Sequence, residues 1–237
     1  MDSLFAALLQ ALALISTSDS PAHAELLGIA QLSLQVAGAS TALACLIGLP
    51  LGTLLAMARF PGKAVLVALV NAALGLPSVI VGLITYLLLS RSGPLGSMGL
   101  LFSPGAMVLA QTLLITPMVV ALTRQPVETA LEGYRDFFDS LRAPSLLRLR
   151  VLLWDCRIAL VTVVLTALGR ALAEVGAVMT VGGNIAGTTR VMTTAIALET
   201  SKGDLPMALA LGIVLLLMVL ALMLAAQWLT LQAQRQA

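Results

Sequence analysis

Charged side chains are scarce in this sequence. Lysine, arginine, aspartate and glutamate make up 10% of the 237 residues, whereas soluble domains carry about 25%. Hydrophobic residues account for 59%. This balance excludes an ordinary soluble domain and predicts an all-α integral membrane protein. The length suffices for about five spans of roughly 20 residues each.

Side chains suited to catalysis or metal binding are also scarce. The chain has one histidine, His23, and two cysteines, Cys45 and Cys156, and they indicate neither a metal cluster nor a disulfide framework. The pattern G-x-x-x-x-G-K-[ST] is absent, so the chain cannot cradle the phosphates of ATP. The net charge of +2 gives no indication of nucleic-acid binding. We therefore expect no catalytic residue, no metal and no cofactor in this chain.

Long apolar stretches dominate the rest of the sequence. They cover residues 26–57, 64–89, 105–123, 158–180 and 205–231. We expect all five to be transmembrane helices, because backbone polar groups in lipid must be satisfied within the segment. The first three contain Pro50, Pro77 and Pro117, which predict kinks packed against protein.

Residues 1–25 allow two interpretations. The run "LFAALLQALALIS" is followed by Ala22-His23-Ala24, which imitates a signal peptide with its cleavage site. The basic segment that normally begins a signal peptide is missing. We therefore favour a short interfacial helix and linker over a cleaved signal, with the membrane domain covering residues 26–237.

Basic residues are distributed unequally between the two sides of the predicted spans. With the amino terminus outside, nine of them fall on one side: Arg59, Lys63, Arg124, Arg135, Arg142, Arg148, Arg150, Arg157 and Arg235. Only Arg91, Arg190 and Lys202 fall on the other side. Because cytoplasmic loops are rich in lysine and arginine, this bias places the loop 124–157 and the carboxyl terminus in the cytoplasm.

Arg170 and Glu174 lie inside the predicted fourth span. Each would cost about 2.5 to 3.5 kcal/mol at the centre of a membrane. In a continuous helix, residues four apart share one face, so we expect the two side chains to face protein or a water-filled cavity. They either line a path along which Arg170 attracts an anion, or form a structural ion pair that fixes helix packing.

The segment after this span is too polar for a simple membrane helix. Residues 191–200 fit a short helix at the outer surface. Asn184, Arg190, Thr193 and Thr194 offer hydrogen bonds and charge to an oxyanion. The alternative is that these groups are satisfied by water and lipid headgroups.

The loop 124–157 carries 11 of the 24 formal charges. Its sequence predicts a short helix with an aromatic face formed by Tyr134, Phe137 and Phe138. A break at 143–145 and a basic amphipathic segment are expected to follow. A solvated loop does not need these aromatic residues. They favour a surface that docks into a soluble partner, with a membrane-surface helix as the alternative.

This loop resembles the coupling loop of ABC-importer permeases, which has a pattern close to Glu-Ala-Ala-x-x-x-Gly. Asp136, Phe137 and Phe138 stand at the Glu-Ala-Ala positions, and Arg142 replaces the glycine. The resemblance implies that a helix in this loop sits in a groove of the ATPase. The implied contact residues are Tyr134, Asp136, Phe137, Phe138, Ser140, Arg142, Ala143, Pro144 and Ser145.

Further segments, "GLPLG", "GLPSVIVGLITYLLLSRSGPLG", "EVGAVMTVGGNI" and "TRVMTTAIALETSKGD", resemble the sulfate, molybdate and tungstate permeases, and the last two are most similar to the tungstate permease. The resemblance implies a type I importer fold in the inner (cytoplasmic) cell membrane. It also implies a homodimer, two cytoplasmic ATPase subunits that bind ATP and Mg, and an external oxyanion-binding protein. The expected function is oxyanion import by alternating access, with an ATP-independent anion transporter or channel as the alternative.

Overall fold

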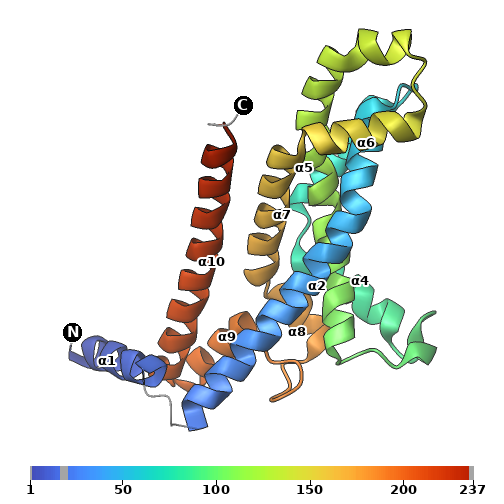
Figure 1. Ribbon diagram of the computed structural model, residues 1–237. Helices are drawn as coiled ribbons and strands as arrows, with labels where there is room; N and C mark the ends of the chain where they lie inside the picture. The colour runs from blue at the N-terminus through green and yellow to red at the C-terminus, as the bar shows by residue number, and fades with distance from the viewer. Residues whose placement is uncertain (1, 17–20, 235–237) are drawn as a thin grey trace. The chain divides into compact units, whose positions relative to one another are not determined.

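Every regular element in the described residues, 2–16 and 21–234, is a helix in the computed structural model (Figure 1). The α-helices are α1 (Asp2–Ser16), α2 (Pro21–Met57), α3 (Lys63–Ala72), α4 (Ser78–Leu89), α5 (Pro104–Ser140), α6 (Ser145–Asp155), α7 (Arg157–Leu172), α8 (Gly176–Gly182), α9 (Met192–Lys202) and α10 (Leu205–Gln234). Two short 3₁₀ helices, η1 (Ala73–Gly75) and η2 (Gly96–Met98), complete the described elements.

Three helices are long and apolar enough to cross a membrane: α2, α5 and residues 205–225 of α10. Two bent pairs bring the number to five if each pair forms one span. The α3–η1 segment meets α4 at 98°, and α6 meets α7 at 75°. The prediction of an all-α membrane protein with about five spans is confirmed in this sense.

The prolines affect their helices differently. Pro77 lies at the sharp bend between η1 and α4. Pro50 lies inside α2, and Pro117 and Pro126 lie inside α5, without ending either helix. Of the three predicted spans that contain a proline, only the second is broken at it.

The fourth predicted span, 158–180, is wrong as a continuous helix. α7 ends at Leu172, and the chain turns before α8 begins at Gly176. A side chain built at Gly176 would lie 2.7 Å from Val79 Cγ2, and one at Gly82 would lie 2.8 Å from Ala177 Cα. Close packing of α8 on α4 thus takes the place of a longer α7.

The third predicted span also has different bounds. We expected it to end at residue 123 and a separate short helix to follow, but α5 continues to Ser140. Arg124 and Glu128, four residues apart, form an ion pair within this extension. Such pairs support an exposed helix by a few tenths of a kcal/mol. Figure 1 shows that the last turns of α5 run across the direction of its earlier turns.

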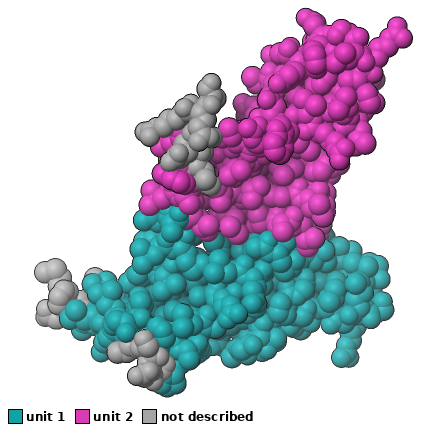
Figure 2. All heavy atoms as spheres, in the orientation of Figure 1, with its two compact units in different colours: residues 1–39, 78–111, 171–221 teal, residues 40–77, 112–170, 222–237 magenta. Residues whose placement is uncertain are grey.

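The chain divides into two compact units, coloured separately in Figure 2. Unit 1 comprises residues 1–39, 78–111 and 171–221. One of its apolar clusters joins Val36, Leu89, Met107 and Val178. A second cluster packs Ala11 of α1 against Leu26, Met192 and Leu211. The predicted interfacial helix therefore contributes to the core of unit 1.

Unit 2 comprises residues 40–77, 112–170 and 222–237. Within it α2 and α5 approach closely, since a side chain at Gly48 would lie 2.8 Å from Val119 Cβ. The cluster at the far end of these helices includes Ala56, Val127, Phe138, Leu152 and Leu160. It joins α2 and α5 to α6 and α7.

Candidate functional site

The first candidate region is the end of α7 and the turn that follows it, residues 170–176. Arg170 is half-buried in the last turn of α7. Glu174 lies beyond the end of that helix and is 2% exposed. The expectation that the two share one helix face is therefore wrong, because the helix ends two residues before Glu174. Whether either residue contacts an anion stays a prediction.

Glu174 is held by hydrogen bonds within unit 1. Its Oε1 accepts the backbone N–H of Ala177 at 3.2 Å. Its backbone carbonyl accepts the hydroxyl of Thr193 at 2.7 Å. Burying a carboxylate is costly unless it is hydrogen-bonded. These bonds therefore fix the start of α8 and tie it to α9.

Further polar side chains surround Glu174. Gln111 Nε2 donates to Ala171 O at 3.0 Å. Ser33 Oγ donates to Ile29 O and accepts the N–H of Met192 at 2.8 Å. The cavity that they line with Glu174 has a volume of about 10 Å³, which holds at most one water molecule. The region is closed to an oxyanion in this conformation.

The segment before α9 uses most of its polar groups internally. Thr194 Oγ1 donates to Val191 O at 3.0 Å and accepts Val191 N–H at 3.1 Å. Asn184 Nδ2 donates to Thr194 O at 3.3 Å. α9 matches the predicted short helix within two residues, but Thr193 and Thr194 are buried. In this conformation Asn184, Thr193 and Thr194 serve the fold of the segment.

Arg190 is placed differently from these residues. Its Nη1 lies 3.5 Å from Glu25 Oε1 in α2, and the side chain is 15% exposed. It lines a hollow of about 220 Å³ beside the first turns of α2. Of the predicted anion contacts in unit 1, Arg190 is the one beside space large enough for a small anion.

The second candidate region is the coupling segment, residues 134–145, in unit 2. We expected Tyr134, Phe137 and Phe138 to form one docking face. The structure corrects this, because Phe138 is 1% exposed and packs in the core of unit 2. Phe137 is 56% exposed. Phe138 therefore does not lie on the surface of unit 2 in this conformation, whereas Phe137 does.

Tyr134 is half-buried beside Phe138, with ring centres 5.6 Å apart. The neighbouring Asp155 carboxylate raises the pKa of the Tyr134 hydroxyl through its charge and a hydrogen bond. Tyr134 thus stays protonated and links the end of α5 to the end of α6.

The remaining predicted contacts lie around the turn between α5 and α6. Asp136, Ser140 and Ser145 are exposed, and Ala143 is buried. Pro144 has extended backbone angles immediately before α6, which confirms the predicted break. Arg142 has a φ of 45°, in the left-handed region that favours glycine. The coupling-loop pattern that this segment resembles has glycine at this position, which suits the same backbone conformation.

Sequence reasoning missed Arg148, which holds this turn together. Its Nε donates to Ala143 O at 2.9 Å, and its Nη2 donates to Phe138 O at 3.3 Å. The same Nη2 pairs with Asp139 Oδ1 at 3.1 Å. A basic residue shortly after a helix-starting proline was the available signal, but only the fold shows which carbonyls it reaches.

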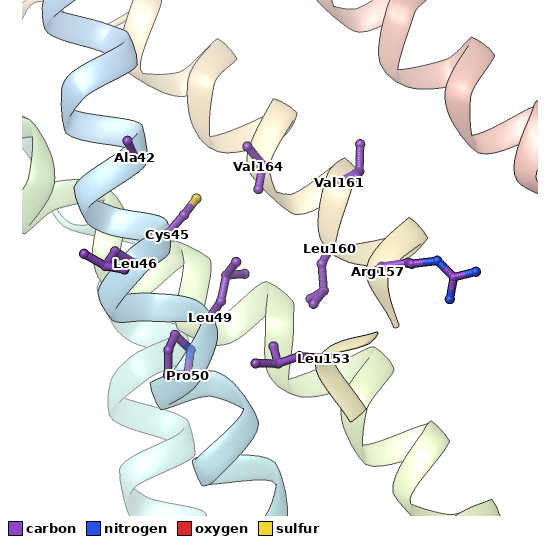
Figure 3. Close-up of a pocket in the computed structure, with 10 residues that line it drawn as sticks. All are labelled: Ala42, Cys45, Leu46, Leu49, Pro50, Leu153, Arg157, Leu160, Val161 and Val164. Carbon is purple, nitrogen blue, oxygen red and sulfur yellow. The ribbon is translucent and has the colours of Figure 1, made fainter. Parts of the chain in front are cut away.

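An open apolar groove of about 510 Å³ also lies in unit 2 (Figure 3). Cys45, Leu46 and Leu49 of α2 and Leu160 of α7 line it, and Arg157 extends away from them (Figure 3). Such a lining offers almost no hydrogen-bond donors to an anion. It suits acyl chains or another helix.

Comparison with known proteins identifies relatives over most of the chain. No protein-family model matches it. It is 40% identical over 200 residues to the "Probable anion ABC transporter permease protein" of Haloferax volcanii, covering 82% of this chain and 86% of the relative. It is 41% identical to the tungstate uptake system permease protein of Peptoclostridium acidaminophilum, covering 81% and 84%. It is 32% identical to the molybdenum transport system permease protein of Mycobacterium tuberculosis, covering 77% and 72%.

All three relatives are named as permease proteins, although the substrates in their names differ. Each comparison covers more than two thirds of this chain and of the relative. The helices that are long and apolar enough to span a membrane agree with a permease. The chain therefore belongs to the family of ABC transporter permease proteins.

Proposed function

We propose that this chain is the membrane-spanning subunit of an ATP-driven importer that carries a tetrahedral oxyanion into the cytoplasm. Tungstate is the favoured substrate, followed by molybdate and sulfate. The observation that supports this order is the identity of 41% to a permease named for tungstate, against 32% to one named for molybdenum.

The complex contains two copies of this chain, two cytoplasmic ATPase subunits and an external oxyanion-binding protein. ATP and Mg are bound by the ATPase, because this sequence lacks the phosphate-binding loop. The chain itself is a transport subunit and not an enzyme. It lies in the inner (cytoplasmic) cell membrane with the amino terminus outside, as the distribution of basic residues indicates.

The coupling segment, residues 134–145, docks into the ATPase. Phe137 supplies the exposed aromatic contact. Movement then passes through the core of unit 2, where Phe138 packs with Leu152 of α6 and Leu160 of α7. Closure of the ATPase on ATP would move α6 and α7 as one body, opening the path outward, and hydrolysis would reset it.

Arg170 is the residue we assign to the anion path. An arginine cannot be deprotonated in a protein and presents a planar fork of donors that matches an oxyanion. Glu174 fixes the turn before α8, because its carboxylate accepts the N–H of Ala177 and its backbone carbonyl accepts the hydroxyl of Thr193. Substrate would therefore approach Arg170 in the last turn of α7.

Reconstitution tests this function. The chain, its ATPase and its binding protein are placed in liposomes, and ATP hydrolysis is measured while tungstate, molybdate or sulfate is titrated into the outer compartment. We expect tungstate to stimulate hydrolysis at the lowest concentration and to accumulate inside only with ATP. Accumulation by the chain alone, without nucleotide, would instead identify an ATP-independent transporter or channel.

A further inference from the structure

We propose that Arg190 and the hollow beside α2 form an oxyanion-binding site in which Glu25 is a displaceable internal competitor. The ligand class rests on the proposed function. The hollow is lined by Glu25, Gly28, Ile29, Leu32, Gly187 and Arg190. All six residues belong to unit 1. The predicted orientation places Glu25, the first turns of α2 and Arg190 toward the external side.

The first observation is the incomplete pairing of Arg190. Its side chain is 15% exposed, so water reaches little of it. Its contact with Glu25 is 3.5 Å long, and its buried Nε has no hydrogen-bond partner in the described residues. Buried polar atoms in native proteins are nearly always paired, and an unpaired one often indicates a bound ion or water. The guanidinium therefore has donor capacity that Glu25 does not use.

The second observation is the space beside this arginine. The hollow of about 220 Å³ is much larger than the volume that one water molecule occupies, about 30 Å³. Gly28 and Gly187 both line it, and a Cβ added at either would meet no atom within 4 Å. A tetrahedral oxyanion fits this volume without displacing the backbone.

The third observation is the exposure of the Glu25 side chain. The side chain of Glu25 is 53% exposed, so its carboxylate can turn into water. Exposed ion pairs contribute little to stability. A doubly charged oxyanion accepts charge-assisted hydrogen bonds of about 2.7 to 2.9 Å from a guanidinium. These bonds are shorter than the 3.5 Å contact between Arg190 and Glu25. Binding requires the guanidinium to turn toward the hollow, which brings the unpaired Nε–H to the ligand.

The charges make the two states exclusive. A bound dianion and the Glu25 carboxylate would repel each other across the same guanidinium, so one must leave when the other binds. Arg190 keeps its positive charge in both states, because its guanidinium is not deprotonated in proteins. Glu25 thus acts as a latch that holds Arg190 when no oxyanion is present.

Tungstate binding to the purified full-length permease tests this site. Titration calorimetry and the tungstate-dependent shift in unfolding temperature are measured without ATPase or binding protein. Glu25→Gln should bind tungstate about fivefold more tightly, because the competing charge is gone. Arg190→Gln should bind at least about tenfold more weakly. Gly28→Phe should also weaken binding by filling the hollow, whereas Gly28→Ala, which meets no neighbour, should bind like the wild type.

If Arg190→Gln fails to fold, Gly28→Phe still tests the site, because it fills the hollow without changing Arg190. Equal affinity in Glu25→Gln and wild type, or in Gly28→Phe and Gly28→Ala, would overturn the site. A thermal shift caused by phosphatidylglycerol vesicles but not by tungstate would also overturn it. Uptake by the complete complex is measured in parallel, and normal tungstate import by Gly28→Phe would reject this inference while leaving the proposed function intact.

Discussion

The guanidinium of Arg148 lies 5.5 Å from the centre of the Phe138 ring. The same group donates hydrogen bonds to Phe138 O and Ala143 O. One side chain of α6 therefore covers the ring at the end of α5 and closes the turn between the two helices. Of the two adjacent phenylalanines, the one that Arg148 contacts is buried and the other is exposed.

The two phenylalanines should respond differently to substitution. Phe138→Ala removes a ring that is 1% exposed and should destabilise the protein by about 3 to 5 kcal/mol. Phe137→Ala, at a side chain that is 56% exposed, should leave the unfolding temperature nearly unchanged. Thermal unfolding of the purified permease in detergent measures both. Equal losses of stability would contradict the placement of Phe138.

Phe137→Asp tests the docking surface separately. A charge at an apolar contact would weaken association with the ATPase, since desolvating it is costly. We expect the ATPase to be lost during purification in detergent, while the permease stays folded. Leu146→Asp is the control, because Leu146 is also apolar and exposed but lies in α6, outside the coupling segment. A full complement of ATPase on Phe137→Asp would remove this residue from the interface.

Arg142 offers a stabilising substitution. Its φ of 45° costs a non-glycine residue about 1 kcal/mol or more. Arg142→Gly should therefore raise the free energy of unfolding by about 1 kcal/mol. Arg135→Gly, at an exposed position inside α5, should lower it by a similar amount, because glycine is a poor helix former. If both variants unfold at lower temperature, the left-handed geometry at Arg142 is not the source of strain.

Arg170→Ala should abolish oxyanion uptake while the complex still assembles and binds ATP. The reason is the loss of the fixed positive charge that we assign to the path. Arg91→Ala, at an exposed position before η2, is the matched control and should transport normally. Radiotracer or elemental uptake into proteoliposomes measures the difference. Wild-type uptake by Arg170→Ala would leave Arg170 with a packing role only.

The contact between α4 and α8 should be sensitive to one methyl group. Gly82→Ala would place its Cβ 2.8 Å from Ala177 Cα and should cost about 1 to 3 kcal/mol through overpacking. Gly212→Ala in α10 meets no atom within 4 Å and should be neutral or stabilising. Unfolding temperatures of the two variants provide the comparison. A neutral Gly82→Ala would show that the two helices can move apart.

Local sequence signals predicted the helical class, the apolar segments and the break at Pro144. They failed at the end of α7, because apolar residues continue beyond Leu172 to Met179 and no proline interrupts them. What ends the helix is distant in sequence: α8 packs on Gly82 of α4, and Thr193 of α9 bonds to Glu174. Single-sequence periodicity contains no information about such partners.

The same limit explains the coupling segment. The spacing of Tyr134, Phe137 and Phe138 correctly indicated an aromatic group on one helix. Which ring turns inward depends on Leu152 and Arg148 of α6, beyond the turn. Likewise, the sequence identified Arg190 as a candidate anion contact, but its pairing with Glu25 joins residues 165 positions apart.

None of the ten residues of α3 is buried. Val65, Leu66 and Leu69 are instead exposed along its length. A helix this short is marginal in water on its own, so its folding depends on acyl chains or a neighbouring subunit around it. Delipidation should therefore melt this helix before the others, and its amides should be the first to exchange with deuterium.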